Sequence, residues 1–511
     1  MSETPTVALT IDGQEITVPA GMNLVEVAHR AGIEIPHYCY HSRLSIAGNC
    51  RVCLVEVEGW GKLQIGCNTG ASDGMAVFTD NERVRAARMG VMELLLINHP
   101  LDCTICDQAG ECKLQDYAVD HGSGVTRFEF DKVKKPKNVS WGDRVVFDSE
   151  RCILCTRCVR FLDEVAGTDE VGVDLRGEKS TLIVKGDGKL TSPYQMNVID
   201  ICPVGALTSR DFRFKSRLWF MKFADTVCTT CARGCNVIVG SRDNRVLRMV
   251  PRLNAAVNDH WMCDHGRLHY AFVNDADRIA TPRVEGAGAP YPVAIQRAQT
   301  ILEGAEDAGI LAVASPFMTN EELFAFKGVL DTLGSRVGGR YFLRPTGEGD
   351  DLLVHPEKCP NARGAALAGF TEAPAEWPDR RWGVVLHVVP REGAELPATV
   401  EARERILFSL TRRDADVCFP LTTWIEKDGT VISAGGHLQR LTKGLTYEPT
   451  LITERLVFDR LHAALEPAYE GADTAAQALA RLAAVYPALE GLTWQKVGPA
   501  GVPLELEGAP A

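Results

Sequence analysis

The chain has 511 residues, of which 45% are apolar and 24% charged, and its formal net charge is −12 at pH 7. This length predicts three or four domains. The acidic balance argues against nucleic acid as a partner, because no basic field would meet the phosphates. The chain opens without a secretion signal and holds no run of about 18–20 apolar residues, so we expect no direct membrane span.

Cysteine is concentrated in the first part of the chain, where 15 of the 17 cysteines lie before residue 264. A secreted disulfide scaffold would be small and would carry a secretion signal. Cysteine pairs separated by two residues are instead typical of metal or cluster ligation in a reducing compartment. The sequence therefore favours metal or cluster binding.

The N-terminal residues predict a small β-grasp domain. Residues 7–12 and 14–20 alternate apolar and polar side chains around an Asp-Gly turn, which predicts a hairpin. Residues 23–31 have capping residues at the start and a glycine after the end, which predicts a helix. Alternation at 54–58 adds a strand, and we place the end of this domain near residue 80.

Further along, residues 81–98 have helical periodicity, and residues 132–137 are expected to form a charged linker broken by a proline. The expected apolar face of the helix comprises Val84, Ala87, Val91, Leu94 and Leu95. Apolar patches at 309–314 and 382–389 alternate with helical patterns, which predicts an α/β domain. Residues 498–511 are rich in proline and glycine and are expected to be a tail.

The first candidate ligand group is Cys39, Cys50, Cys53 and Cys67. Two bridged irons need four terminal thiolates, and plant-type ferredoxins take three from one loop and a fourth from further downstream. The first gap is longer here, and two cysteine pairs could also bind zinc. The β-grasp context favours a [2Fe–2S] cluster.

The second candidate group is His99, Cys103, Cys106 and Cys112. Three closely spaced thiolates leave one corner of a [4Fe–4S] cubane without a ligand. A histidine at the end of a helix is more often a capping or core residue than a ligand. The spacing alone therefore does not assign His99 to a metal.

The third candidate group is Cys152, Cys155, Cys158 and Cys202, the last followed by a proline. The C-x2-C-x2-C run places three sulfurs at three corners of a cubane, a spacing that zinc sites rarely use. In two-cluster ferredoxins the Cys-Pro cysteine serves the other cluster. Because only one such run exists here, we expect Cys202 to complete the same [4Fe–4S] cluster.

The fourth candidate group is Cys228, Cys231, Cys235 and Cys263. It again offers four thiolates for a [4Fe–4S] cluster, with a zinc ribbon as the alternative. The isolated Cys359 and Cys418 are expected to be buried free thiols.

Five longer stretches, which contain members of all four ligand groups, together resemble one family. The stretches are A-G-N-C-R-V-C-L-V-E-V (47–57), N-H-P-L-D-C-T-I-C-D-Q-A-G-E-C-K-L-Q (98–115), R-C-I-L-C-T-R-C-V-R-F (151–161), I-C-P-V-G-A-L-T (201–208) and W-M-C-D-H-G-R (261–267). They resemble the large iron–sulfur subunit of the peripheral arm of bacterial respiratory complex I, and the resemblance covers nearly the whole chain. Residues 98–115 are its most specific part.

The resemblance implies that His99 is an axial ligand of the second cluster. It also implies that one [2Fe–2S] and two [4Fe–4S] clusters carry electrons from a flavin subunit toward quinone. The fourth group resembles an extra [4Fe–4S] cluster of many bacterial members and the cluster signature of molybdopterin oxidoreductases. The chain departs from the family at Gly70, where proline is common, at residues 195–197, and in a shorter C-terminal region.

The predicted fold class is an α+β multi-cluster N-terminal region followed by an α/β truncated molybdopterin-oxidoreductase-like domain. The predicted domains are a [2Fe–2S] ferredoxin-type β-grasp domain (1–80), a His-Cys-ligated [4Fe–4S] domain (81–122), a ferredoxin-like [4Fe–4S] domain (145–220), a molybdopterin-oxidoreductase-type [4Fe–4S] domain (221–277) and a non-catalytic α/β domain (278–511).

The implied function is electron transfer within NADH-quinone oxidoreductase, coupled in the whole complex to proton translocation. The implied cofactors are one [2Fe–2S] and three [4Fe–4S] clusters, without molybdopterin. No G-x-G-x-x-G or flavin motif is found, so we expect NADH oxidation in a partner and no catalytic residue in this chain. The implied partners are the flavin subunit, the 24 kDa-type [2Fe–2S] subunit and the quinone-side hydrophilic subunits, at the cytoplasmic side of the bacterial inner membrane.

Three alternative functions remain open from the sequence. They are the electron-transfer subunit of an NAD-linked hydrogenase, a molybdenum formate dehydrogenase subunit and a zinc scaffold without redox activity. The arginines next to the ligands, Arg51, Arg151, Arg157 and Arg160, could raise the local reduction potential. Ordinary solvated or ion-paired surface is the favoured interpretation of these four.

Overall fold

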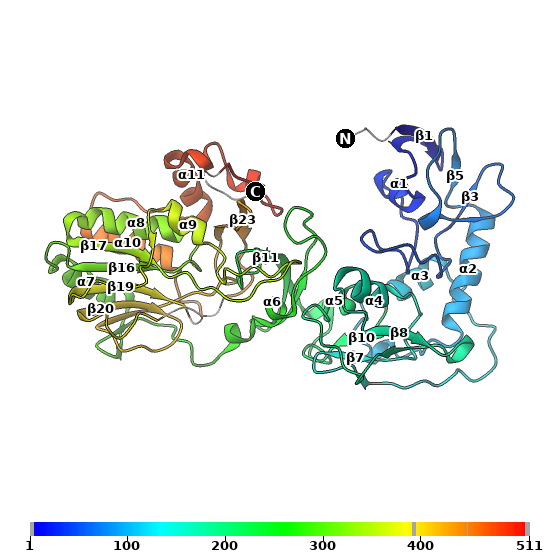
Figure 1. Ribbon diagram of the computed structural model, residues 1–511, viewed down its shortest axis with the longest axis horizontal. Helices are drawn as coiled ribbons and strands as arrows, with labels where there is room; N and C mark the ends of the chain where they lie inside the picture. The colour runs from blue at the N-terminus through cyan, green and yellow to red at the C-terminus, as the bar shows by residue number, and fades with distance from the viewer. Residues whose placement is uncertain (1–4, 391–394, 447, 506–511) are drawn as a thin grey trace. The chain divides into compact units, whose positions relative to one another are not determined.

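The computed structural model describes residues 5–390, 395–446 and 448–505, and the chain divides into two compact units after Phe220 (Figure 1). The predicted features at residues 1–4 and 506–511 lie outside the described ranges. No helix within those ranges is both long and apolar enough to cross a membrane. The finer domain boundaries inside the two units remain predictions.

The first unit begins with a five-stranded sheet in the order β2-β1-β5-β3-β4. Its elements, with those of the rest of the unit, are β1 (Thr6–Ile11), β2 (Gln14–Pro19), α1 (Leu24–Arg30), β3 (Leu54–Val57), β4 (Gln64–Ile65), η1 (Gly66–Asn68), β5 (Ala76–Phe78), α2 (Glu82–Leu96), η2 (Cys103–Ile105), α3 (Lys113–His121), β6 (Val139–Ser140), β7 (Val145–Phe147), α4 (Arg157–Arg160), η3 (Phe161–Val165), β8 (Val171–Asp174), η4 (Gly177–Lys179), β9 (Thr181–Val184), α5 (Asn197–Asp200), β10 (Leu207–Ser209) and η5 (Leu218–Phe220). The predicted hairpin and first helix are confirmed. Strands β1 and β2 pair antiparallel, and the Asn23 side chain caps α1 by accepting from the Glu26 N–H.

Helix α2 and the segment after it differ from the prediction. Leu94, expected on the apolar face, is 70% exposed, whereas Arg88 is buried because its guanidinium donates to three backbone carbonyls. The expected linker is fixed in place, because Lys132 Nζ donates to the carbonyls of Leu96 and Ile97 at the end of α2 (2.8 and 2.7 Å). A lysine at this end is favourable, since the last carbonyls of a helix lack partners within it.

The second unit contains an eight-stranded sheet in the order β15-β14-β21-β20-β19-β16-β17-β18. The elements of this unit are β11 (Lys222–Val227), β12 (Asn236–Arg242), β13 (Arg245–Pro251), α6 (Asp264–Leu268), η6 (Ala271–Asn274), β14 (Arg283–Val284), β15 (Ala287–Gly288), α7 (Tyr291–Glu303), β16 (Ile310–Ala314), α8 (Asn320–Leu333), η7 (Gly334–Arg336), β17 (Val337–Phe342), α9 (Ala362–Leu367), β18 (Thr371–Glu372), β19 (Trp382–Val389), β20 (Ala402–Ser409), β21 (Val417–Pro420), β22 (Gly429–Ile432), β23 (His437–Leu441), α10 (Glu454–Leu465), α11 (Ala475–Val485), η8 (Pro487–Leu489), α12 (Trp494–Val497) and β24 (Val502–Pro503).

The strands from β16 to β21 run parallel to one another. Their spatial order corresponds to the 3-2-1-4-5-6 order of dinucleotide-binding folds, with the reversal between β16 and β19. Alternate residues of β16 face opposite layers: Ile310, Ala312 and Ala314 contact the core that α7, α8 and α10 share, whereas Leu311 and Val313 contact a separate cluster. The predicted α/β character of this region is therefore confirmed.

The expected C-terminal tail is partly structured. Strand β24 pairs antiparallel with β23, and Val502 and Leu504 pack against a small apolar cluster. The prediction was wrong for these residues because proline in an edge strand need not donate to the sheet, so the composition did not exclude a strand.

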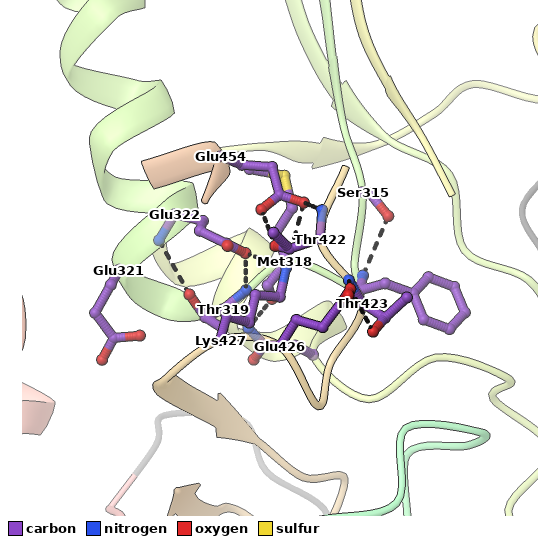
Figure 2. A network of polar contacts seen from close by, with 12 residues as sticks. Ser315, Met318, Thr319, Glu321, Glu322, Thr422, Thr423, Glu426, Lys427 and Glu454 are labelled. Atoms are coloured by element: carbon purple, nitrogen blue, oxygen red, sulfur yellow. Dashed lines mark hydrogen bonds and ion pairs between the residues drawn. The ribbon is translucent and has the colours of Figure 1, made fainter. Parts of the chain in front are cut away.

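Buried charges join α8 to the loop before β22 and to α10 (Figure 2). Lys427 Nζ lies 2.8 Å from Glu322 Oε2 and 3.5 Å from Glu454 Oε1. Beside them, the Glu321 carboxylate accepts from the Thr430 N–H (2.7 Å) and hydroxyl (2.8 Å). Burial raises the pKa of Glu321 from its ordinary value of 4.5 to about 7.

The raised pKa of Glu321 predicts a pH dependence of stability. Between about pH 4.5 and 7 the folded state binds a proton that the unfolded state has lost, so stability falls as pH rises through this window. Glu321→Gln should remove this fall, which amounts to at most about 3.5 kcal/mol at about 1.4 kcal/mol per pKa unit. Hydrogen exchange of α8 amides, corrected for intrinsic rates, measures it.

The matched control is Glu303→Gln, because Glu303 is an exposed carboxyl at the end of α7. The control should retain the pH dependence of the parent chain. A Glu321→Gln chain that loses as much α8 protection as the parent between these pH values would contradict the assignment.

Candidate metal centres

The first ligand group is assembled in the five-stranded region of the first unit. Cys39 and Cys53 are 1% exposed and Cys67 is fully buried. The Cys67 thiol contacts those of Cys39 and Cys53, and Cys39 also contacts Cys50. These thiol–thiol contacts raise the pKa of Cys50 and Cys67, so the four can all be thiolates only around a strong positive charge.

The third group surrounds a small cavity that all four predicted ligands line, together with Phe147, Ile153, Thr156, Leu182, Val204, Ala206 and Leu207. Leu154 (φ 52°) and Thr156 (φ 58°) adopt left-handed backbone conformations, which bulky residues rarely do. The first of them turns its N–H toward Cys152 Sγ at 3.4 Å. Burial raises the pKa of the Cys202 thiol to about 12.

The second group is less enclosed. Cys106 is buried, Cys112 and His99 are half-buried, and Cys103 is exposed. The three thiols are close enough for their charges to raise the pKa of Cys112, whose largest shift comes from burial. Burial lowers the pKa of His99 to about 4, against the opposing effect of the nearby Asp102 carboxylate. His99 is therefore a neutral imidazole at physiological pH, which is the form that binds metals.

The fourth group lies in the second unit, and all four of its cysteines are buried. Three lie in the connection between β11 and β12, where the Cys228 N–H donates to the Cys235 carbonyl at 2.8 Å. Cys263 caps α6, and its sulfur accepts from the Gly266 N–H at 3.3 Å. A Cβ on Gly266 would lie 3.1 Å from Cys228 Sγ and 3.3 Å from Cys263 Sγ, so glycine gives both sulfurs room.

No group of three or more His, Cys, Asp or Glu side chains in the described ranges is arranged around a single-ion position. The donor chemistry of the four groups is that of iron–sulfur proteins, in which each cluster takes four protein ligands, mostly thiolates. The lined cavity of the third group and the glycine between two sulfurs of the fourth fit this chemistry.

Two arginines of α4 connect the first group to the third. Arg160 Nη2 donates to the carbonyls of Cys39 (2.6 Å) and Cys155 (3.2 Å), one from each group. Arg157 donates to the carbonyls of Tyr40 and Ile201, which adjoin Cys39 and Cys202. The first and third groups are therefore neighbours in the first unit.

The third group also adjoins the second. A Cβ built on Gly205, three residues after Cys202, would lie 2.1 Å from Cys106 Sγ. Arg151, the residue before Cys152, donates to Asp102 Oδ2 at 2.9 Å. The third group therefore lies between the other two.

Sequence reasoning missed these connections. The favoured interpretation of the flanking arginines as solvated or ion-paired surface is wrong for Arg157 and Arg160, whose hydrogen bonds go to backbone carbonyls, and Arg151 is buried. One available signal was that residues 157 and 160 lie three apart and so share a helix face. Cys359 and Cys418 are buried and free, as predicted.

Four family profiles match consecutive parts of the chain. They are "2Fe-2S iron-sulfur cluster binding domain" (residues 4–82), "NADH-ubiquinone oxidoreductase-G iron-sulfur binding region" (88–127), "NADH-quinone oxidoreductase subunit 3, ferredoxin-like domain" (142–208) and "NADH-ubiquinone oxidoreductase NDSU1/NuoG-like, 4Fe-4S domain" (221–271). With the geometry of the thiols, these matches define an iron–sulfur protein that has both [2Fe–2S]- and [4Fe–4S]-binding domains.

Curated relatives indicate which kind of iron–sulfur protein the chain resembles. The NADH-quinone oxidoreductase G subunit of Rickettsia conorii is 40% identical over 333 residues, which cover 64% of this chain and 49% of that protein. The mitochondrial NADH dehydrogenase [ubiquinone] iron-sulfur protein 1 of Solanum tuberosum is 42% identical over 331 residues, covering 64% and 44%. The chain is similar to these NADH-quinone oxidoreductase proteins and spans about half the length of the curated relatives it matches.

A solved structure of NAD+-reducing [NiFe]-hydrogenase in the H2-reduced state shares 31% sequence identity with the chain. It covers 42% of this chain and 91% of its own, with a TM-score of 0.37.

The close approach at Gly205 predicts the effect of a single methyl group. Gly205→Ala should push Cys106 from its position, so the variant should lose about four irons, the content of one cubane, while the first and third groups keep theirs. Iron analysis and EPR of the reduced protein measure this. Gly61→Ala is the control, because a Cβ there meets open space. Full iron content in Gly205→Ala would contradict the role of Cys106 as a ligand.

Proposed function

We propose that this chain transfers electrons through bound iron–sulfur clusters as a subunit of NADH-quinone oxidoreductase, in a complex that translocates protons. The observation that carries the proposal is the 40% identity to G subunits over 333 residues. The proposed ligands are Cys39, Cys50, Cys53 and Cys67 for the [2Fe–2S] cluster, and His99, Cys103, Cys106 and Cys112, then Cys152, Cys155, Cys158 and Cys202, then Cys228, Cys231, Cys235 and Cys263 for three [4Fe–4S] clusters. When bound, the clusters supply one-electron redox chemistry.

The order of transfer in the first unit follows from the contacts between ligand loops. Arg160 bonds to one residue of the first group and one of the third, and Gly205 brings the third against Cys106 of the second. Electron tunnelling falls steeply with distance, so neighbouring groups exchange electrons fastest. We infer the order first, third, second, which differs from the order along the sequence.

We infer that the second unit is a molybdopterin-oxidoreductase-like domain that binds no molybdopterin. Ligands of sheets with this strand order bind at the carboxyl edge where the order reverses, between β16 and β19. A cavity of about 60 Å³ lies there, lined mostly by apolar residues such as Phe317, Met318 and Trp424. Its charged residues, Lys427 and Glu454, pair with each other. The β16–α8 turn contains no glycine, and carboxylates occupy the first turn of α8, which disfavours phosphate.

The proposed partners are the flavin subunit, the 24 kDa-type [2Fe–2S] subunit and the quinone-side hydrophilic subunits of the complex. The proposed location is peripheral, at the cytoplasmic side of the bacterial inner membrane. Apolar residues beside the second group, Leu101 and Ile105, are exposed next to Cys103, as expected where a partner would approach.

Metal analysis tests the cofactor assignment. We expect about 14 irons per chain, the content of one [2Fe–2S] and three [4Fe–4S] clusters, with matching acid-labile sulfide. We expect no molybdenum. A content of about 10 irons per chain would mean that one of the three proposed [4Fe–4S] clusters is absent. Stoichiometric molybdenum would favour the formate dehydrogenase alternative, and zinc without sulfide would favour the scaffold.

The ligand role of His99 predicts a local effect of its removal. His99→Ala should alter or abolish one EPR signal of the reduced protein and leave the other clusters intact, because the three thiolates of its group remain. His29→Ala is the control, since His29 is exposed at the end of α1. Spectra identical to those of the parent chain would show that His99 is a helix-end residue.

A further inference from the structure

The loop that carries Cys39 and Cys50 is fastened to the third group at several points besides the two arginine contacts. Asn49 Nδ2 donates to the Leu154 carbonyl at 3.0 Å. The Ser45 N–H donates to Glu164 Oε2 at 2.8 Å, and the Ser45 carbonyl accepts from Arg160. Glu164 lies in η3, a single π-helical turn directly after α4, and such turns are frequent at functional sites.

The two arginines are placed differently from ordinary surface arginines. Each is half-buried, and their hydrogen bonds to carbonyls leave the positive charges without a carboxylate partner at either guanidinium among the described contacts. Burial lowers the pKa of Arg157, while Cys155, Cys202 and Cys39 act to raise it, which places this cation near ligands of both groups.

Arg157 also has a hydrogen-bond donor to spare. Its Nε is buried and has no acceptor among the described residues. Buried N–H groups normally have an acceptor. The sulfur that either bound cluster would bring is an acceptor of suitable chemistry, and hydrogen bonds to sulfur are one means by which proteins set cluster potentials.

We propose that Arg157 and Arg160 form a cationic bridge that fixes the separation of the first and third clusters and raises the reduction potential of both. The inference rests on the proposed function, because it requires a cluster at each group. Each cluster gains one negative charge on reduction, and a nearby cation stabilises the reduced form. Because one pair of charges serves both sites, the two potentials move together.

The test is an EPR-monitored redox titration of the cluster-loaded full chain. Arg160→Gln removes one charge and should lower the midpoint potentials of the first and third clusters together. The expected size is about a tenfold drop in the reduced-to-oxidised ratio at fixed potential, or about 59 mV for one electron. The matched control is Arg176→Gln, an exposed arginine of the β8–β9 connection, which should shift neither.

Arg160→Lys separates charge from geometry. Lysine keeps the positive charge but lacks the planar fork that reaches two carbonyls. Both potentials should therefore stay near those of the parent, while the magnetic coupling between the two reduced clusters changes as their separation loosens. A purely structural role for Arg160 would change the coupling in both variants without a shift of potential in Arg160→Gln.

Iron content is measured first, because a parent chain without these two clusters contradicts the proposed function rather than the bridge. If Arg160→Gln does not load its clusters, Arg157→Gln takes its place with the same expected shift. Unchanged potentials in a loaded variant, or a shift of only one of the two clusters, would overturn the bridge.

Discussion

The first unit depends on guanidinium groups that donate hydrogen bonds to the backbone carbonyls beside the predicted ligands. Loops that wrap a metal centre have few regular backbone bonds, and buried carbonyls need donors. Arg88 donates to the carbonyls of Val52 and Leu54, on either side of Cys53. Arg217 does the same for the loop of the second group. One rigid fork with five donors can hold carbonyls from two loops, which lysine cannot do.

The cations of α4 in the first unit and those around α8 in the second unit have different kinds of partner. In the first, the cations of α4 lie beside thiols that would become anionic on metal binding, so their charge is available to a ligand. In the second, Lys427 lies between Glu322 and Glu454, and Arg278 pairs with Glu426 at 2.6 Å. Those charges are neutralised within the protein, where breaking a pair is costly. The pairs of Lys427 and Arg278 therefore stabilise the structure of the second unit.

The sequence predicted what depends on neighbouring residues. Capping residues located α1, and cysteine spacing grouped the thiols, because both signals lie within a few residues of each other. The contacts between groups were not predictable in this way. Arg160 and Cys39 are 121 residues apart, and the residues around each of them contain no signal that predicts their contact. The burial of Arg88 likewise depends on carbonyls that are distant in the sequence.

The Lys132 contact with the end of α2 has a consequence for maturation. The bond joins residues 36 positions apart and closes a loop that contains His99 and the three cysteines of the second group. Closing such a loop costs chain entropy. The hydrogen bonds of Lys132 offset part of this cost in the chain without bound metal. The apoprotein would then hold this loop partly ordered before iron and sulfide are delivered. Insertion of a cluster would therefore require less ordering of the chain.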